Sequence, residues 1–226
     1  MIDHVLDETG RITLKYIGHS QGTTSFFVMA SDKPDYNSKI SLMVALSPVA
    51  YMSHVKSPIV RLLAPTNRLL HGIFKLVGVH EFLPDNRLLR ALKQLMCGAS
   101  PTAEILCGNI LFLIAGFGYD QMNVTNLPVI YGHIPSGAAT KQFIHYAQSF
   151  ISGEFRHYDY GAEDNLKKYG TDLPPDYKLS NVVAPVSLFY NIHKVPYHPF
   201  NHLDFLWAKD FKNIVYYRLR KLMRYF

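Results

Sequence analysis

The stretch KYIGHSQGTT, residues 15–24, places Ser20 between Gly18 and Gly22. Before it, residues 12–17 form a short β-branched and aromatic run that is typical of a buried strand. After it, residues 21–31 have the pattern of a helix. A strand that turns directly into a helix at a serine predicts a sharp turn with an exposed hydroxyl group. A surface turn with an unreactive serine is the alternative interpretation.

Gly-x-Ser-x-Gly between a strand and a helix is the nucleophile elbow of α/β-hydrolases, in which the serine has a strained backbone. Side chains beside such a serine would collide, so we expect Gly18 and Gly22 to leave the turn the space it needs. Two further apolar runs, residues 40–46 and 182–190, predict parallel strands that are buried on both faces. The predicted fold class is α/β: an incomplete α/β-hydrolase core with few parallel strands.

Composition excludes several classes of protein. Of the 226 residues, 48% are hydrophobic and only 18% are charged, which indicates a packed globule. The net charge of +6 is spread along the chain without a long basic run, so we expect no nucleic-acid partner. The longest apolar stretch, residues 110–119, is far shorter than the ~20 residues that cross a bilayer. We therefore expect no transmembrane segment.

The sequence has residues that are typical of secreted proteins, but no visible signal peptide. The first ten residues, MIDHVLDETG, carry acidic residues where a signal peptide would be basic and then apolar, so no signal peptide is visible. Cys97 and Cys107 are the only cysteines, and Asn123 begins an Asn-x-Thr glycosylation acceptor. Together these residues favour an oxidising compartment. Two free thiols and a chance acceptor sequence are the alternative.

The middle of the chain has helical periodicity. Basic residues Arg61, Arg68 and Lys75 recur every seventh residue among leucine, isoleucine and phenylalanine, and residues 136–151 repeat the pattern. We expect residues 1–50 to form a hydrolase core with the elbow, residues 51–150 a helical cap, and residues 151–226 the rest of the core. A cap of this kind would cover an apolar trough for lipid. Plain helical packing explains the periodicity equally well.

Stretches along nearly the whole chain match one family in order. They are MIDHVLDETG, KYIGHSQGTTSFFVMAS, ALSPVAYMSHVKSPIVRLLAP, EFLP, CGNILFLIAGF, NLPVIYGHIPSGAATKQFIHYAQ, FRHYDYG, YGTDLPPDYKLSNVVAPVSLFY and FNHLDFLWAKD. On these stretches the sequence resembles the acid lipases, the group that contains lysosomal acid lipase and gastric lipase. So many matches in one order exclude chance agreement.

The resemblance implies a serine lipase without metal or organic cofactor. Ser20 matches the family nucleophile, and His202 matches the general base that takes its proton. The backbone N–H of Gln21 would donate to the oxyanion. The implied reaction is hydrolysis of carboxylic esters of long-chain lipids, such as triacylglycerols or sterol esters, through an acyl-enzyme at a lipid–water interface. Nothing in the sequence sets an oligomeric state.

The resemblance also carries structural and cellular expectations. Cys97 and Cys107 occupy the positions of a disulfide in the family cap. Asn123 lies where family members are often glycosylated. Secretion or a lysosomal location follows from the family and not from any signal in this sequence.

Two departures from the family pattern reduce the expected activity. The sequence begins within the helix before the elbow strand, so the family's N-terminal half, with the second oxyanion donor, is not part of it. The triad aspartate is also absent, because no Asp or Glu lies between Tyr190 and His202. Asp204 is a weak substitute, since the family carries this residue together with the true triad acid.

These departures leave two function classes open. The first is an impaired lipase. The second is a non-catalytic lipid-binding or partner-binding remnant of a lipase. A hydrolase of small polar esters is disfavoured by the apolar content of residues 51–150 and by the resemblance.

Overall fold

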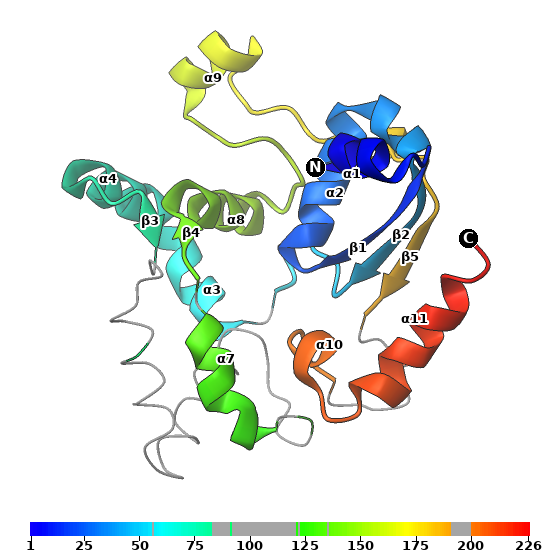
Figure 1. The fold of residues 1–226 in the computed structure, drawn as a ribbon. Helices are drawn as coiled ribbons and strands as arrows, with labels where there is room; N and C mark the ends of the chain where they lie inside the picture. Colours follow the sequence, from blue (N-terminus) through cyan, green and yellow to red (C-terminus); the bar gives the residue numbers. More distant parts are fainter. Residues whose placement is uncertain (56, 83–90, 92–120, 122, 135, 191–199) are drawn as a thin grey trace. The chain divides into compact units, whose positions relative to one another are not determined.

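A computed structural model describes residues 1–55, 57–82, 91, 121, 123–134, 136–190 and 200–226 (Figure 1). The chain divides into two compact units. Unit 1 consists of Met1–Ala50 and Pro175–Phe226, and unit 2 of Tyr51–Pro174. Cys97 and Cys107 lie outside the described residues, and with them the expected disulfide.

Unit 1 contains a three-stranded parallel sheet in the order β1-β2-β5 (Figure 1). Its strands are β1 (Leu14–His19), β2 (Ile40–Leu46) and β5 (Val186–Phe189), and both pairings are parallel. This confirms the small parallel sheet expected of an incomplete α/β fold. Strand β5 is shorter than the predicted run of residues 182–190. Pro185, just before β5, has no N–H to donate to a ladder.

Strand β2 is the centre of unit 1 and is buried on both faces. Leu42, Val44 and Leu46 point to one face, while Met43 and Ala45 point to the other. The first face packs against Phe200, Phe205, Ala208, Val215 and Leu219, and the second, which Ile40 joins, against Phe26, Ala30 and Ala184. A continuous apolar run with helices on both faces is typical of a parallel sheet.

Helices cover both faces of this sheet. Helices α1 (Ile2–Thr9) and α2 (Gln21–Asp32) lie on one side in Figure 1, and α10 (Asp204–Trp207) and α11 (Tyr217–Leu222) on the other. Short turns η1 (Pro34–Lys39), η4 (Leu179–Asn181) and η5 (Lys212–Tyr216) connect or extend them. The end of the chain is thus a π-helical turn, η5, followed directly by α11.

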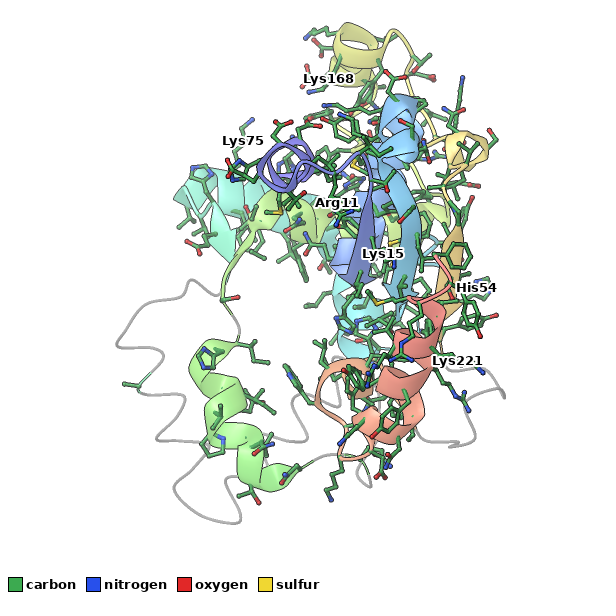
Figure 2. The ribbon with its side chains drawn as sticks, turned by 45° about the vertical axis from the view of Figure 1, so that its right-hand side comes forward. Arg11, Lys15, His54, Lys75, Lys168 and Lys221 are labelled. Carbon is green, nitrogen blue, oxygen red and sulfur yellow. The ribbon has the colours of Figure 1, made fainter. Side chains whose placement is uncertain are left out.

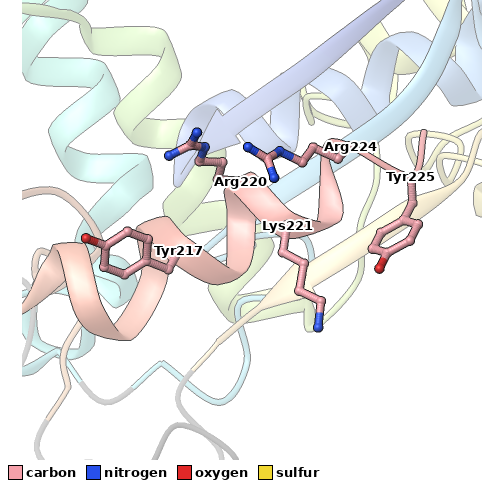
Figure 3. Close-up of a pocket in the computed structure, with 5 residues that line it drawn as sticks. All are labelled: Tyr217, Arg220, Lys221, Arg224 and Tyr225. Atoms are coloured by element: carbon pink, nitrogen blue, oxygen red, sulfur yellow. The ribbon is translucent and has the colours of Figure 1, made fainter.

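The exposed side of α11 is basic and aromatic. A pocket of about 440 Å³ is lined by Tyr217, Arg220, Lys221, Arg224 and Tyr225, all from this end of the chain (Figure 3). Figure 2 shows Lys221 of α11 and Lys15 of β1, and the Lys15 ammonium group donates to the Met223 carbonyl. This bond ties the C-terminal end of the chain to the edge strand β1.

A buried asparagine joins the two sequence halves of unit 1. The Asn37 amide group donates to the carbonyls of Ala30, Pro34 and Asn181 at 2.8–3.1 Å. Its Oδ1 accepts from the amides of Val183 and Ala184 at 3.0 and 3.1 Å. Asn37 therefore provides hydrogen-bond partners for backbone groups outside the sheet. These include the N–H groups of Val183 and Ala184, the two residues before Pro185 and β5.

Unit 2 is mainly helical. Its elements are α3 (Pro58–Leu63), η2 (Ala64–Thr66), α4 (Asn67–Val77), β3 (Glu81–Phe82), η3 (Val124–Asn126), α7 (Leu127–His133), β4 (Ala138–Ala139), α8 (Thr140–Ser152) and α9 (Ala162–Tyr169). Strands β3 and β4 pair antiparallel. Within the described residues, no helix has the length and apolar character needed to cross a bilayer.

Unit 2 extends beyond residue 150, where we expected the cap to end. The His145 ring donates its Nε2–H to the Arg156 carbonyl oxygen at 2.8 Å, and the Gln148 side chain donates to the carbonyl and accepts from the backbone N–H of Asp159. These bonds attach the chain after α8 to α8 itself. The boundary consequently lies at Pro174.

Candidate active site

Ser20 lies on a sharp turn between β1 and α2. Its backbone angles are φ 51° and ψ −116°, a sparsely populated conformation for a residue with a side chain. The Ser20 amide donates to the Leu46 carbonyl at the end of β2, at 3.1 Å, and its carbonyl accepts from Thr23 at 2.9 Å. The turn is therefore fixed by the neighbouring strand and by the first turn of α2, as an elbow requires.

The structure distinguishes the two glycines of the elbow. A Cβ at Gly18 would lie 2.8 Å from the carbonyl carbon and 2.9 Å from the carbonyl oxygen of Gly22. A Cβ at Gly22 would have nothing within 4 Å. The close approach thus requires glycine at residue 18. At residue 22 the expected steric reason for glycine is absent, because the space beside it is open.

His202 reaches Ser20 from the other end of the chain. Its Nε2 lies 2.7 Å from Ser20 Oγ, across 182 residues of sequence. A serine hydroxyl within hydrogen-bond reach of an imidazole is the geometry of an activated nucleophile and its base. The structure therefore brings together the two side chains that the sequence singled out for catalysis.

Asp204 stabilises the turn that carries His202. The Asp204 carboxylate accepts a hydrogen bond from the backbone N–H of Asn201 at 2.6 Å. In return, the side-chain Oδ1 of Asn201 accepts from the backbone N–H of Asp204 at 3.2 Å. Burial raises the pKa of Asp204 to about 6, partly offset by the Asn201 amide. This reciprocal pair fixes the backbone on both sides of His202. The carboxylate bonds the Asn201 amide, and the His202 ring bonds other groups.

The second ring nitrogen of His202 meets a hydroxyl group. Ser47 Oγ lies 2.6 Å from His202 Nδ1. Ser47 directly follows β2, has a φ of 51°, and donates its amide to the Phe189 carbonyl at 2.8 Å. In the sequence, Ser47 stands out only as the residue that follows the apolar run of residues 40–46. Its position just after the strand next to the elbow strand could have revealed it, because carboxyl ends of parallel strands share one sheet edge.

His19 completes the surroundings of His202. Its Nε2 lies 2.9 Å from the His202 carbonyl oxygen, and the two rings are 5.0 Å apart. Burial lowers the pKa of His19. Burial, and to a smaller extent the charge of His19, lowers the pKa of His202 to about 4. Near neutral pH, His202 is an uncharged imidazole and can accept a proton.

The structure also describes Gln21 and Asn123, the other expected site residues. Gln21 is the first residue of α2. Its backbone N–H therefore belongs to the first turn of the helix, where N–H groups have no partner within the helix. Asn123 is partly exposed, and its Oδ1 accepts from the Thr125 amide at 3.2 Å. In the described part of the chain, no group of three or more His, Cys, Asp or Glu residues could hold a metal ion.

Curated proteins similar to this chain are named lipases. Lipase 3 of Drosophila melanogaster is 37% identical over 99% of the chain, and gastric triacylglycerol lipase of Mus musculus is 33% identical over 98%. Lipase member M of Homo sapiens is 30% identical over 99%. These likenesses support an acid lipase-like family for this chain. No protein-family model matches it.

The match covers only part of each relative. The chain spans 63% of Lipase 3, 61% of the mouse gastric lipase and 57% of Lipase member M. The activity, substrates and partners of the whole protein are therefore matters of proposal.

The two elbow glycines give a matched pair of substitutions. We expect Gly18→Ala to lower the free energy of unfolding by about 1–3 kcal/mol, because the new methyl group would press on the Gly22 backbone. Gly22→Ala should leave it unchanged or raise it by up to about 1 kcal/mol, since alanine favours a helix. Urea denaturation measures both values. Equal losses in the two variants would contradict the close approach at Gly18.

Asp204 gives a prediction about pH. Its pKa is higher in the folded chain than its ordinary value of 3.8. The unfolded chain therefore holds the charge more easily, and the folded chain loses stability as pH rises through about 6. Asp204→Asn removes the charge and keeps an acceptor for the Asn201 amide. We expect its midpoint of thermal unfolding to exceed that of the unaltered chain by about 2–4 °C above pH 6, with no gain below about pH 4.

Asp204→Ala is the control for the hydrogen bond. It removes both the charge and the acceptor, so it should be less stable than Asp204→Asn at every pH. A difference between Asp204→Asn and the unaltered chain that is the same at pH 4 and pH 8 would contradict the buried charge.

Proposed function

We propose that this chain hydrolyses carboxylic esters of long-chain lipids, such as triacylglycerols or sterol esters, through an acyl-enzyme on Ser20. The observation that carries the proposal is the 2.7 Å contact between Ser20 Oγ and His202 Nε2 on a strained elbow. The lipase names of the relatives support the choice of lipid esters.

The proposed chemistry has two half-reactions. Ser20 Oγ attacks the ester carbonyl carbon while His202 Nε2 accepts the hydroxyl proton, and negative charge moves to the carbonyl oxygen. The Gln21 amide is the donor that we assign to this oxyanion. His202 then returns the proton to the leaving alcohol as its bond to the acyl carbon breaks. A water molecule then attacks the acyl carbon while His202 accepts one of its protons, and His202 returns that proton to Ser20 Oγ as the bond between Oγ and the acyl carbon breaks and the fatty acid leaves.

The state of His202 sets the pH range of the reaction. Only neutral imidazole can accept the Ser20 proton, and burial keeps the pKa of His202 near 4. Activity should therefore persist as pH falls to about 5 and disappear below about 4. Acidic conditions of this kind would suit the secreted or lysosomal location that we propose, with Asn123 as a glycosylation site.

We expect turnover to be slow. Both ring nitrogens of His202 meet hydroxyl groups, and within the described residues no hydrogen bond joins the ring to a carboxylate. Loss of the orienting acid costs about 10⁴ in turnover in a serine protease. A non-catalytic role in binding lipid or a partner is the second candidate, favoured by the same uncharged surroundings.

The test uses a fluorophosphonate probe and a fluorescent lipid ester in detergent micelles. We expect Ser20→Ala to abolish labelling and turnover, and His202→Ala to reduce both by about 10²–10⁴. Ser25→Ala is the matched control, because Ser25 is an exposed serine of α2 one turn away from the elbow. Its labelling should equal that of the unaltered chain.

The pH profile of labelling is part of the same experiment. The rate should be nearly constant from about pH 5 to 7 and fall as His202 is protonated near pH 4. Labelling that survives Ser20→Ala, or no labelling with retained binding to lipid micelles, would overturn the proposal in favour of the non-catalytic role.

A further inference from the structure

We infer that Ser47 is the residue that positions His202, with its hydroxyl group in the place of an orienting carboxylate. The inference rests on the proposed function. Two hydroxyl groups lie on either side of the His202 imidazole. Ser20 Oγ lies 2.7 Å from Nε2, and Ser47 Oγ lies 2.6 Å from Nδ1.

The sheet places the two serines on either side of the ring. His19 of β1 pairs with Leu46 of β2, so Ser20 and Ser47 are the next residues on two neighbouring strands. Both have a φ of 51°, and both donate their amides to the carbonyl of an adjacent strand. The backbones that carry their hydroxyl groups are thus held by hydrogen bonds to the sheet.

The hydrogen-bond pattern defines what Ser47 does. A neutral imidazole carries one proton, so Nε2 can accept from Ser20 only when Nδ1 holds that proton. Nδ1–H then needs an acceptor, and Ser47 Oγ is at the right distance. A hydroxyl group orients the ring without adding a charge. A carboxylate would also stabilise the imidazolium formed during catalysis.

The groups around the His202 ring decide how easily the ring takes up a proton. His19 contacts it from β1, Ser20 and Ser47 from the strand ends, and Asp204 belongs to its own turn. The Asp204 carboxylate is bonded to the Asn201 amide. In the part of the chain that the structure describes, a carboxylate introduced at residue 47 would be the first to face Nδ1 directly, and it would favour the protonated ring.

Two substitutions at residue 47 separate positioning from folding. Ser47→Gly removes the hydroxyl group and suits the positive φ, so it should fold at least as well as the unaltered chain. Ser47→Asp replaces the hydroxyl group by a carboxylate. Ser41→Ala is the control, because Ser41 lies on the same strand, with its hydroxyl group 3.4 Å from the Leu14 carbonyl oxygen.

The experiment measures the rate of fluorophosphonate labelling at Ser20 against pH, and kcat and KM with a short-chain nitrophenyl ester. We expect Ser47→Gly to lower kcat about tenfold or more with KM unchanged, as loss of one orienting hydrogen bond implies. Ser47→Asp should raise the rate at pH 7 and move the acid limb of the profile to higher pH. Ser41→Ala should match the unaltered chain.

The outcomes separate this inference from the proposed function. If Ser47→Gly labels at the same rate and Ser47→Asp keeps the same pH profile, while the unaltered chain labels at Ser20, the inference alone is wrong. If the unaltered chain does not label at Ser20, the proposed function fails, and the inference fails with it.

Discussion

The register of β1 against β2 is the constraint on which the candidate site depends. Because His19 is paired with Leu46, the residues that follow them leave the sheet at the same level. The amide of Ser20 bonds the Leu46 carbonyl, and the amide of Ser47 bonds the Phe189 carbonyl. A shift of one residue in this pairing would turn the buried side chains of β2 to the wrong faces and separate the two hydroxyl groups.

The position of His202 follows from packing on the same sheet. Phe200 and Phe205 flank the His202 turn and are buried against the face of β2 that carries Leu42 and Val44. The reciprocal bonds between Asn201 and Asp204 then fix the turn between these anchors. Hydrophobic burial thus brings the imidazole to the sheet edge, and polar contacts fix its direction. The result is a buried, uncharged base between two hydroxyl groups.

The sequence predicts the local parts of this arrangement well. The turn at Ser20, β2 and the helix after Ser20 depend on neighbours in sequence, and the structure has a strand and a helix at these places. The contacts of Ser47 and His19 with His202 do not follow from neighbours in sequence, because they span 155 and 183 residues. The steric roles of Gly18 and Gly22 look equal in the motif, and only the backbone positions separate them. Likewise, Asp204 lies two residues from His202, yet its carboxylate points to the Asn201 amide.

The state of the His202 ring tests the central claim most directly. Nitrogen-15 NMR of the histidine-labelled chain, with His202 assigned by its loss in His202→Gln, reports which ring nitrogen carries the proton. We predict a neutral ring between about pH 5 and 7, protonated at Nδ1 and unprotonated at Nε2, that titrates near pH 4. A ring protonated mainly at Nε2, or one that titrates at the ordinary value near 6.5, would contradict it.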